Sequence, residues 1–269
     1  MLKLGLPKGR LLGRSRAAVE AFAGAAAETF GGAAPGGRPY PRFLRMPDIP
    51  DLVAEGLLDV GIAGGEWLAE SGADVVRVAP LCWYHVRICA LSPPGGIPEG
   101  DGPVRVVSEY PRVAAGFASG RWGSGFTQRT VRGSVEHYLP DLADVAVECV
   151  ETGESMRRRG LIAAHVLFAA DVWLVCSRAA ASDAGTSALL NRWAEAIATP
   201  SPDCPEQDRP PQGRPAPGCS VPHGPSGPSG RPEHHELTEL TELTELTELT
   251  ELSGRTAKGG DRGAHHSLA

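Results

Sequence analysis

The sequence lacks the marks of a membrane protein. Aromatic residues make up only 6% of the 269 residues, and no uninterrupted apolar run approaches the ~20 residues that a membrane-spanning helix requires. The N-terminus also has no apolar stretch as long as a secretion signal. We therefore expect a cytoplasmic protein that makes no contact with a membrane.

The cysteines form no metal-binding or dithiol motif. The chain has six of them, and no two have the spacing of a CxxC motif. This spacing argues against a zinc or thiol-redox site. We expect four of the six, which lie in apolar runs, to be small core residues of a reduced protein.

An excess of basic residues is also absent. The formal net charge is -6, and beyond residue 200 there are 6 Lys and Arg against 11 Asp and Glu, which leaves 20 against 21 in residues 1–200. A near-neutral body gives no electrostatic reason to expect nucleic-acid binding. An anionic ligand would have to be held by a few placed basic groups and by backbone dipoles.

The last part of the chain has the composition of a disordered segment. Residues 201–232 are crowded with Pro, Gly and Ser, and residues 236–252 repeat Glu-Leu-Thr with a period of three. A period of three fixes no apolar face on a helix and defeats the alternation of a strand. We therefore predict a disordered tail over 201–269.

The first 200 residues alternate strand-like and helical patterns, which predicts an α/β fold. A first strand at 1–6 precedes an Ala-rich helix, and we expect separate strands at 75–79 and 82–92 and again at 165–170 and 172–176. The βα units form two groups. We therefore predict two lobes with a ligand cleft between them, the first built from 1–85 plus 172–200 and the second from 86–171.

The stretch 143–156, which reads ADVAVECVETGESM, has the form of an anion-binding loop. A strand with alternating valines leads into a turn that contains Thr152, Gly153 and Ser155, and we expect a helix over 156–161. Backbone N–H groups and two hydroxyls would then point at one place, and Gly153 would let the backbone approach a phosphate closely. The alternative is an ordinary capped start of a helix.

Acidic and basic residues flank this loop and the first strand. Glu148 and Glu151 do not suit phosphate binding, so we expect them to accept hydrogen bonds from sugar hydroxyls or to hold a hydrated Mg²⁺. Phosphate donors beside hydroxyl acceptors suit a ribose 5-phosphate. Lys8 and Arg10 follow the first strand, at the sheet edge where α/β proteins bind ligands. The alternatives are a plain turn for these two and a surface position for Glu136, which begins another predicted helix.

Six motifs occur in the order of a known family. They are LPKGR at 6–10, LRMPDIP at 44–50, LLDVGIAG at 57–64, SEYP at 108–111, GSVE at 133–136, and the loop 148–155 followed by Met156. With these motifs the chain resembles the short-form catalytic chain of ATP phosphoribosyltransferase over about residues 1–198. That enzyme performs the first step of histidine biosynthesis.

The resemblance implies a fold, a reaction and partners. The fold would be two α/β lobes like those of type II periplasmic binding proteins. The reaction would join N1 of the adenine of ATP to C1 of phosphoribosyl pyrophosphate, releasing pyrophosphate, with Mg²⁺. A homo-oligomer and a regulatory subunit like histidyl-tRNA synthetase would be the protein partners, because 201–269 cannot supply the regulatory domain of the long form.

The resemblance also assigns roles to individual residues. Two carboxylates would act in catalysis: Glu148 would hold the ribose hydroxyls, and Glu136 would lie close to the ribose and its Mg²⁺. The other matched residues would bind substrate. They are Lys8, Arg10 and Arg45 for the polyphosphates, Asp59 on the nucleotide side, and Glu151, Thr152, Gly153, Glu154 and Ser155 in the phosphate loop.

Two positions depart from the family pattern. The family usually has Asp where this chain has Glu148, and Glu154 puts an acid inside the phosphate loop. A displaced carboxylate and like-charge repulsion would both lower activity. The alternatives to an active enzyme are therefore an impaired relative that binds nucleotide or phosphosugar and regulates a partner, and a two-lobed binding protein without chemistry.

Overall fold

The computed structural model describes residues 1–32, 37–99 and 102–199, which belong to one compact unit. The predicted tail at 201–269 lies outside the described residues. No helix in the described part of the chain is both long and apolar enough to cross a bilayer. The strands are β1 (Lys3–Pro7), β2 (Tyr40–Leu44), β3 (Val60–Gly64), β4 (Val76–Ser92), β5 (Val104–Ser108), β6 (Phe126–Thr130), β7 (Val145–Val150) and β8 (Ile162–Cys176).

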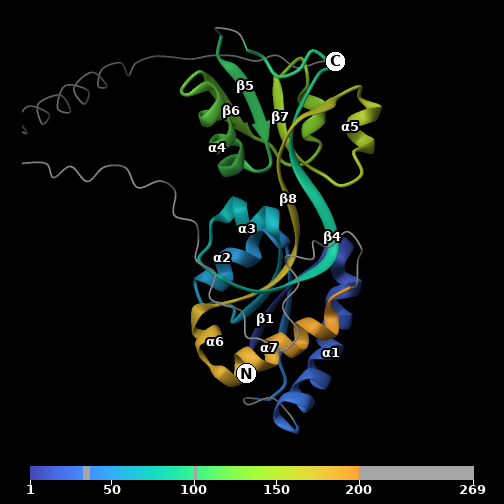
Figure 1. The fold of residues 1–269 in the computed structure, drawn as a ribbon, viewed down its shortest axis with the longest axis vertical. Helices are drawn as coiled ribbons and strands as arrows, with labels where there is room; N and C mark the ends of the chain where they lie inside the picture. The colour runs from blue at the N-terminus through green and yellow to red at the C-terminus, as the bar shows by residue number, and fades with distance from the viewer. Residues whose placement is uncertain (33–36, 100–101, 200–269) are drawn as a thin grey trace, which may run out of the picture. The chain divides into compact units, whose positions relative to one another are not determined.

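The helices alternate with these strands, as the predicted α/β class requires. The α-helices are α1 (Leu12–Phe30), α2 (Ile49–Ala54), α3 (Gly65–Ser71), α4 (Pro111–Trp122), α5 (Glu154–Arg158), α6 (Arg178–Ser182) and α7 (Ala184–Ile197), and the 3₁₀ helices are η1 (Gly9–Leu11), η2 (Met46–Asp48) and η3 (Val135–Tyr138). The prediction of an α/β fold is confirmed (Figure 1).

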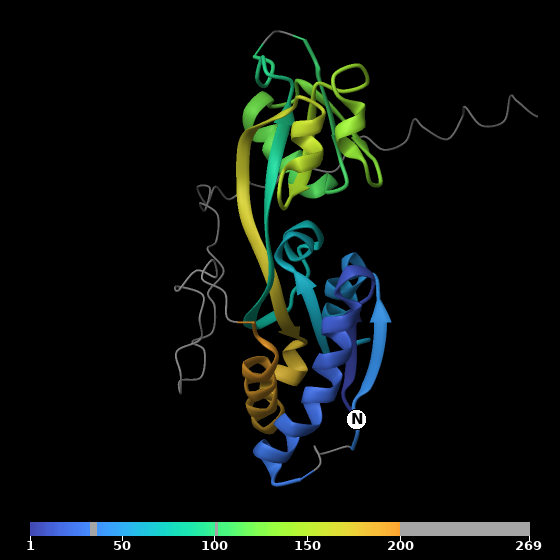
Figure 2. The ribbon, with the colours of Figure 1, turned by 90° about the vertical axis from the view of Figure 1, so that its right-hand side faces the viewer.

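All eight strands form one mixed sheet, in the order β2-β1-β3-β8-β4-β7-β5-β6. The pairs of β1 with β2 and β3 are parallel, as are those of β5 with β6 and β7. The long strands β4 and β8 lie antiparallel to each other and join the two parallel groups (Figures 1 and 2). The prediction of two shorter strands at each of these places was wrong, because each pair of apolar runs forms one continuous strand.

The pairing of β4 with β8 is interrupted near its middle. Residues 76–80 of β4 pair with the carboxyl half of β8, and residues 85–92 pair with its amino half, with a register shift between Pro80 and His85. On one side of this shift lie β1–β3 and on the other β5–β7, and we call these groups the first and second lobe. The lobe boundaries given in the sequence analysis remain predictions.

Each lobe has its own apolar core. In the first lobe Phe22 of α1 packs edge to face against the fully buried Trp193 of α7, with ring centroids 5.2 Å apart. In the second lobe the valines of β7 are buried against α4 and η3. Between the lobes, Glu70 of α3 accepts hydrogen bonds from the backbone N–H groups of Arg112 and Val113 at the start of α4, both at 3.0 Å.

Two predicted helices differ from the observed ones. The helix after the phosphate loop begins at Glu154 and ends at Arg158, earlier and shorter than the predicted 156–161. The helix expected after Ser134 is only the 3₁₀ turn η3, and Ser134 adopts a left-handed conformation without capping it through its side chain. A five-residue helix has a small dipole, so the loop must hold an anion mainly through individual donors.

Candidate active site

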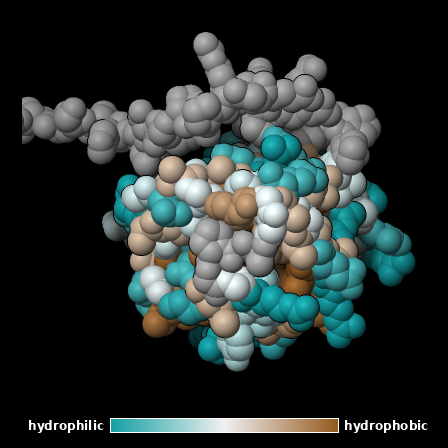
Figure 3. Space-filling view, turned by 90° about the horizontal axis from the view of Figure 1, so that it is seen from below, coloured by the Kyte–Doolittle hydropathy of each residue, from teal (hydrophilic) through white to brown (hydrophobic). Residues whose placement is uncertain are grey.

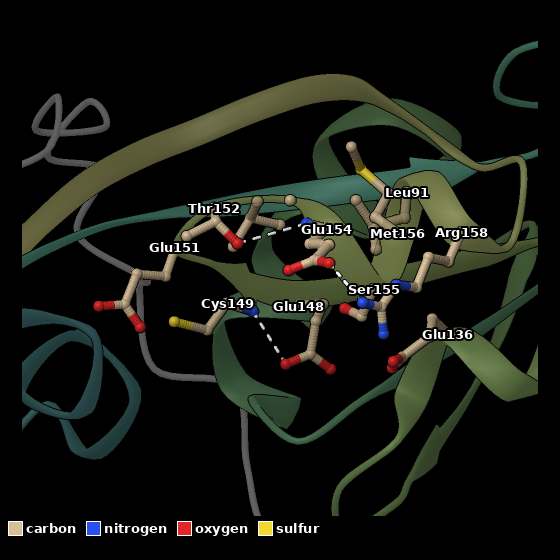
Figure 4. Close-up of a pocket in the computed structure, with 12 residues that line it drawn as sticks. Leu91, Glu136, Glu148, Cys149, Glu151, Thr152, Glu154, Ser155, Met156 and Arg158 are labelled. Atoms are coloured by element: carbon tan, nitrogen blue, oxygen red, sulfur yellow. Dashed lines mark hydrogen bonds and ion pairs between the residues drawn. The ribbon is translucent and has the colours of Figure 1, made fainter. Parts of the chain in front are cut away.

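The turn between β7 and α5 lines a pocket of about 350 Å³. Its walls come from the end of β7, from the loop and α5, and from single residues of β4 and η3 (Figure 4). The lining residues are Leu91, Glu136, Glu148, Cys149, Val150, Glu151, Thr152, Gly153, Glu154, Ser155, Met156 and Arg158. All the phosphate-loop residues predicted from the sequence therefore face one cavity, together with both predicted catalytic carboxylates.

Gly153 shapes the loop. Its φ is 71°, in the left-handed region that glycine adopts without strain, and it directly precedes α5. A Cβ at this position would also lie 3.0 Å from an Nη1 of Arg157. The same guanidinium donates to the carbonyl of Thr152 at 2.9 Å, and the N–H of Glu154 donates to the Thr152 hydroxyl at 3.4 Å. The turn is thus fixed by its own contacts, as a phosphate-binding loop has to be.

Glu148 lies on the inner wall of the pocket with part of its carboxylate unsatisfied. Its Oε1 accepts a hydrogen bond from the N–H of Cys149 at 3.1 Å, whereas its Oε2 is buried without a described partner. Burial, together with the nearby carboxylates of Glu109 and Glu136, raises the pKa of Glu148 to about 7. A buried oxygen without a partner is the place where a ligand hydroxyl or a cation gains most.

The inner wall suits a cation that is held mostly by a ligand. Glu136 lines the pocket from η3, and Figure 4 shows its carboxylate and that of Glu148 on the same side of the loop. Within the described ranges no group of three His, Cys, Asp or Glu side chains could hold a metal ion by itself. Mg²⁺ commonly uses one or two carboxylates and completes its shell with substrate phosphates and water. The two carboxylates fit that role.

The acid inside the loop, Glu154, has a basic partner. Glu154 forms an ion pair with Arg158, four residues later on the short helix α5. Both side chains are exposed, so the pair contributes at most about 1 kcal/mol and can separate. The charge of Arg158 therefore offsets the repulsion expected between Glu154 and a phosphate. Because the ion pair can separate, Arg158 can itself bind a phosphate in the pocket that it lines.

Glu151 connects the loop to the first lobe. It forms an ion pair with Arg10 of η1, whose guanidinium also lies 4.7 Å from the centroid of the Tyr84 ring. The Tyr84 hydroxyl donates to Glu66 Oε1 at 2.5 Å, and Glu66 is buried at the start of α3. Burial raises the pKa of Glu66. A row of contacts therefore runs from the pocket to the end of β3.

Two predicted polyphosphate ligands lie at neighbouring strand ends. Pro7 pairs with Leu44, so Lys8 and Arg45 directly follow the carboxyl ends of β1 and β2. The N–H of Lys8 donates to the carbonyl of Leu44 at 2.8 Å, and both basic side chains are exposed. Neither lines the pocket of about 350 Å³, whereas Arg10 reaches it through Glu151.

Asp59 lies elsewhere. It precedes β3 at the amino end of that strand, and its Oδ2 accepts a hydrogen bond from the N–H of Lys3 at 2.7 Å. Lys3 begins β1, whereas the predicted ligands Lys8 and Arg10 follow the end of that strand. The structure thus gives Asp59 a part in joining β1 to β3 and does not bring it to the pocket.

Sequence reasoning missed three contributors to the site. Arg158 was detectable, because a Glu and an Arg four residues apart on a helix face each other. Glu109, within the SEYP motif, helps to raise the pKa of Glu148 but lies far from it in sequence. The hydrogen bond from Tyr84 to Glu66 joins two separate segments of the chain, and no local sequence pattern predicts it.

Comparison with known proteins agrees with this arrangement. The family model of ATP phosphoribosyltransferase (HisG) matches residues 45–199. An ATP phosphoribosyltransferase of Moorella thermoacetica is 33% identical over 196 residues, which cover 66% of this chain and 84% of the relative. One from Thermus thermophilus is 31% identical over 140 residues, covering 51% of this chain and 65% of the relative.

A solved structure shows the same fold. It is the ATP phosphoribosyl transferase (HisG:HisZ) complex from Thermotoga maritima, which superposes with a TM-score of 0.64 and 23% identity and covers 73% of this chain and 98% of that chain. At this identity the likeness concerns the fold alone.

Proposed function

Because the chain belongs to the ATP phosphoribosyltransferase family, pentosyltransferases of histidine biosynthesis, we propose that its phosphate loop binds the 5-phosphate of phosphoribosyl pyrophosphate. One observation carries this assignment to the loop. A left-handed glycine turn, two hydroxyl residues and a buried carboxylate with an unpartnered oxygen all line the same pocket of about 350 Å³. Groups that donate hydrogen bonds to a phosphate, beside a carboxylate that accepts them from hydroxyl groups, match a phosphorylated pentose.

The inner-wall carboxylates face the reacting sugar. In the reaction the bond between C1 and the pyrophosphate oxygen breaks, its electron pair leaves with pyrophosphate, and the lone pair of adenine N1 forms the new bond to C1. Positive charge develops at C1 in between. The carboxylate of Glu148 stabilises that charge and accepts hydrogen bonds from the ribose hydroxyls, and Glu136 acts beside it.

Basic groups on the first lobe meet the leaving group. Lys8 and Arg45 follow adjacent strand ends, and Arg10 lies against the loop. Their positive charges stabilise the charge that pyrophosphate carries away. Bound Mg²⁺ would supply further charge compensation there, and Glu148 and Glu136 are the residues that would hold it, together with substrate phosphates.

We propose the remaining partners by the same family relation. ATP is the second substrate, and Asp59 stays a predicted residue of the nucleotide side. The fold neighbour belongs to a HisG:HisZ complex, and this supports a regulatory subunit of that kind. The homo-oligomer is proposed from the family relation alone. A cytoplasmic location follows from the biosynthetic role. No observation favours the alternative of an impaired regulatory relative, and the ion pair of Glu154 with Arg158 removes one reason for it.

The test measures catalysis and binding separately. Purified protein is mixed with ATP, phosphoribosyl pyrophosphate and Mg²⁺, and N1-phosphoribosyl-ATP is followed by its absorbance. Ser155→Ala should weaken binding of the phosphorylated sugar, measured by calorimetry, about 10-fold, because a hydrogen bond to a charged group is worth roughly 1.5–3 kcal/mol.

Ser182→Ala is the matched control. The Ser182 hydroxyl donates to a carbonyl within α6 and takes no part in the pocket, so sugar binding should stay unchanged. Unaltered binding by Ser155→Ala would remove the loop from the site. Calorimetry with the sugar decides this even if turnover requires a regulatory subunit.

A further inference from the structure

The start of α4 in the second lobe is capped by a side chain of the first lobe. Oε1 of Glu70 in α3 accepts a hydrogen bond from the N–H of Arg112, and Oε2 accepts one from the N–H of Val113, each at 3.0 Å. N–H groups in the first turn of a helix have no partner inside the helix, and a carboxylate there also meets the positive end of the helix dipole. Glu70 therefore supplies from the other lobe what a capping residue usually supplies from the chain just before the helix.

The other N–H groups of this turn are accounted for within the second lobe. The N–H of Tyr110 donates to the Ser108 hydroxyl at 2.8 Å, and the N–H of Ala114 donates to the carbonyl of Tyr110 at 2.9 Å. Pro111, the first residue of α4, has no N–H to place. The two donors that remain are those that Glu70 binds, so separating the lobes would leave them to water.

Two further contacts join the same two helices. The ring of Trp67 in α3 lies against that of Tyr110, with centroids 4.6 Å apart, and packs against the apolar core of the second lobe. The guanidinium of Arg112 donates to the carbonyl of Ser71 at 3.2 Å and fills the space beside Gly72, where a Cβ would clash with it. We call these contacts together the interlobe clamp, formed by Trp67, Glu70, Ser71 and Gly72 with Tyr110, Arg112 and Val113.

On the second-lobe side the clamp is tied to the phosphate loop. The Ser108 hydroxyl, which accepts the N–H of Tyr110, donates to the carbonyl of Val147 at 2.7 Å. Val147 lies in β7, the strand that ends at the phosphate loop. Tyr110 also belongs to the apolar cluster against which Cys149 of the pocket packs. The start of α4 and the loop are therefore held in one body.

On the first-lobe side the clamp is tied to the basic residues. α3 directly follows β3, and β3 pairs with β1, whose end is followed by Lys8. In Figures 1 and 2 α3 is the helix of the first lobe nearest the second lobe. Figure 3 shows the opposite end of the first lobe, where apolar residues occur as separate patches among polar ones. The clamp thus fixes how far the basic residues after β1 and β2 lie from the phosphate loop.

We propose that Glu70 is a positioning residue for the transfer of the phosphoribosyl group. By capping α4 from the first lobe, it holds the two lobes at the separation at which both meet one molecule of phosphoribosyl pyrophosphate. The 5-phosphate then lies in the loop and the pyrophosphate at Lys8 and Arg45, so this role rests on the proposed function of the loop. Without the cap, the substrate itself has to order the two lobes, and that cost weakens its binding.

Glu70→Ala in the full-length chain tests this role with two ligands. Ribose 5-phosphate meets only the second lobe, whereas phosphoribosyl pyrophosphate with Mg²⁺ meets both lobes. In calorimetry the variant should bind ribose 5-phosphate as wild type does, but phosphoribosyl pyrophosphate about 10-fold more weakly, the factor that corresponds to losing one helix cap. Glu195→Ala, at an exposed position of α7, is the matched control and should bind both ligands as wild type does.

The same measurements separate this role from the proposed function. If wild type does not bind ribose 5-phosphate, or Ser155→Ala binds it as tightly as wild type does, the assignment of the loop fails and the role of Glu70 fails with it. If the loop does bind the sugar phosphate, two results overturn the role of Glu70 alone. Equal weakening of both ligands would show a purely structural cap, and unchanged binding of both would show that the clamp does not position the lobes.

Hydrogen exchange on the free protein measures the clamp itself. The backbone amides of Arg112 and Val113 should exchange more slowly in wild type than in Glu70→Ala, whereas the amide of Ala114, which donates within the second lobe, should change less. Equal exchange of Arg112 and Val113 in the two proteins would overturn the proposal. If Glu70→Ala does not fold, as judged by circular dichroism, Glu70→Gln replaces it. Its amide keeps one acceptor oxygen, so the binding of phosphoribosyl pyrophosphate should weaken by a smaller factor, again without a change for ribose 5-phosphate.

Discussion

The inner wall and the rim of the phosphate pocket carry their acidic residues in opposite ways. On the inner wall Glu148 is largely buried, and no described Lys or Arg forms an ion pair with it. On the rim Glu151 and Glu154 are exposed, and each is paired with an arginine. The difference leaves the buried Glu148, and not the paired acids of the rim, as the carboxylate with an oxygen that lacks a described partner.

The largest effect should come from the inner wall. Glu148→Gln keeps the shape of the side chain and removes its charge. Turnover should fall by roughly 100-fold, which is the scale of losing one placed electrostatic contact in the transition state. Steady-state rates of N1-phosphoribosyl-ATP formation measure this. A loss of less than about 3-fold would contradict the assignment of Glu148 to the reacting sugar.

The same residue should make stability depend on pH. Because its pKa rises from 4.5 to about 7 on folding, the folded state holds a proton that the unfolded state has released. Its contribution to stability is thus fully present below pH 4.5 and is lost as the pH rises through about 7, a change of about 3 kcal/mol.

Glu148→Gln removes this dependence. The free energy of unfolding of the variant minus that of wild type should therefore be larger at pH 8 than at pH 5. Urea unfolding at the two pH values measures this difference. Glu154→Gln is the control, and it should keep the pH dependence of wild type. Equal differences at both pH values would show that Glu148 is not desolvated.

A smaller effect should appear where the rim meets the first lobe. Arg10 has to leave Glu151 in order to meet a polyphosphate, so Arg10→Gln should raise KM for phosphoribosyl pyrophosphate about 10-fold through the loss of a charged hydrogen bond. Glu151→Gln should instead lower KM slightly at low salt, because it removes a competitor for the guanidinium. If KM changes in opposite directions in the two variants, Glu151 competes with the substrate for Arg10. If KM rises in both, the two residues bind the substrate together.

The smallest effect should come from Glu154. Its ion pair with Arg158 is exposed, so Glu154→Gln should alter stability by at most about 1 kcal/mol and KM by no more than about 3-fold. Thermal unfolding and steady-state kinetics at low and high salt measure both. A loss of activity as large as that of Glu148→Gln would contradict the distinction between the inner wall and the rim of the pocket.

Local patterns predicted the parts of the molecule that local physics decides. The alternation of β7, the glycine turn and the hydroxyls of Thr152 and Ser155 were all readable, because a strand that enters a turn has a short signature. The α/β class followed from alternating elements in the same way.

Contacts between distant segments decided the rest. β4 is one strand because β8 lies along its whole length, and the turn between its two apolar runs becomes a register shift within it. The pair of Glu154 with Arg158 is an exception: it is local, but it was missed because the helix was predicted to begin at residue 156 and not at Glu154. Asp59 shared a motif with the ligand edge but lies at the opposite end of its strand.

The two long strands also determine how the first lobe can open away from the phosphate loop of the second lobe. Since β4 and β8 both run from one lobe into the other, any opening has to flex this two-stranded ribbon, most easily at the register shift between Pro80 and His85. Trp83 and Tyr84 lie there, and each faces an arginine of the first lobe, Arg14 and Arg10. A ligand that pulls on Arg10 would therefore act directly on the joint that the two lobes share.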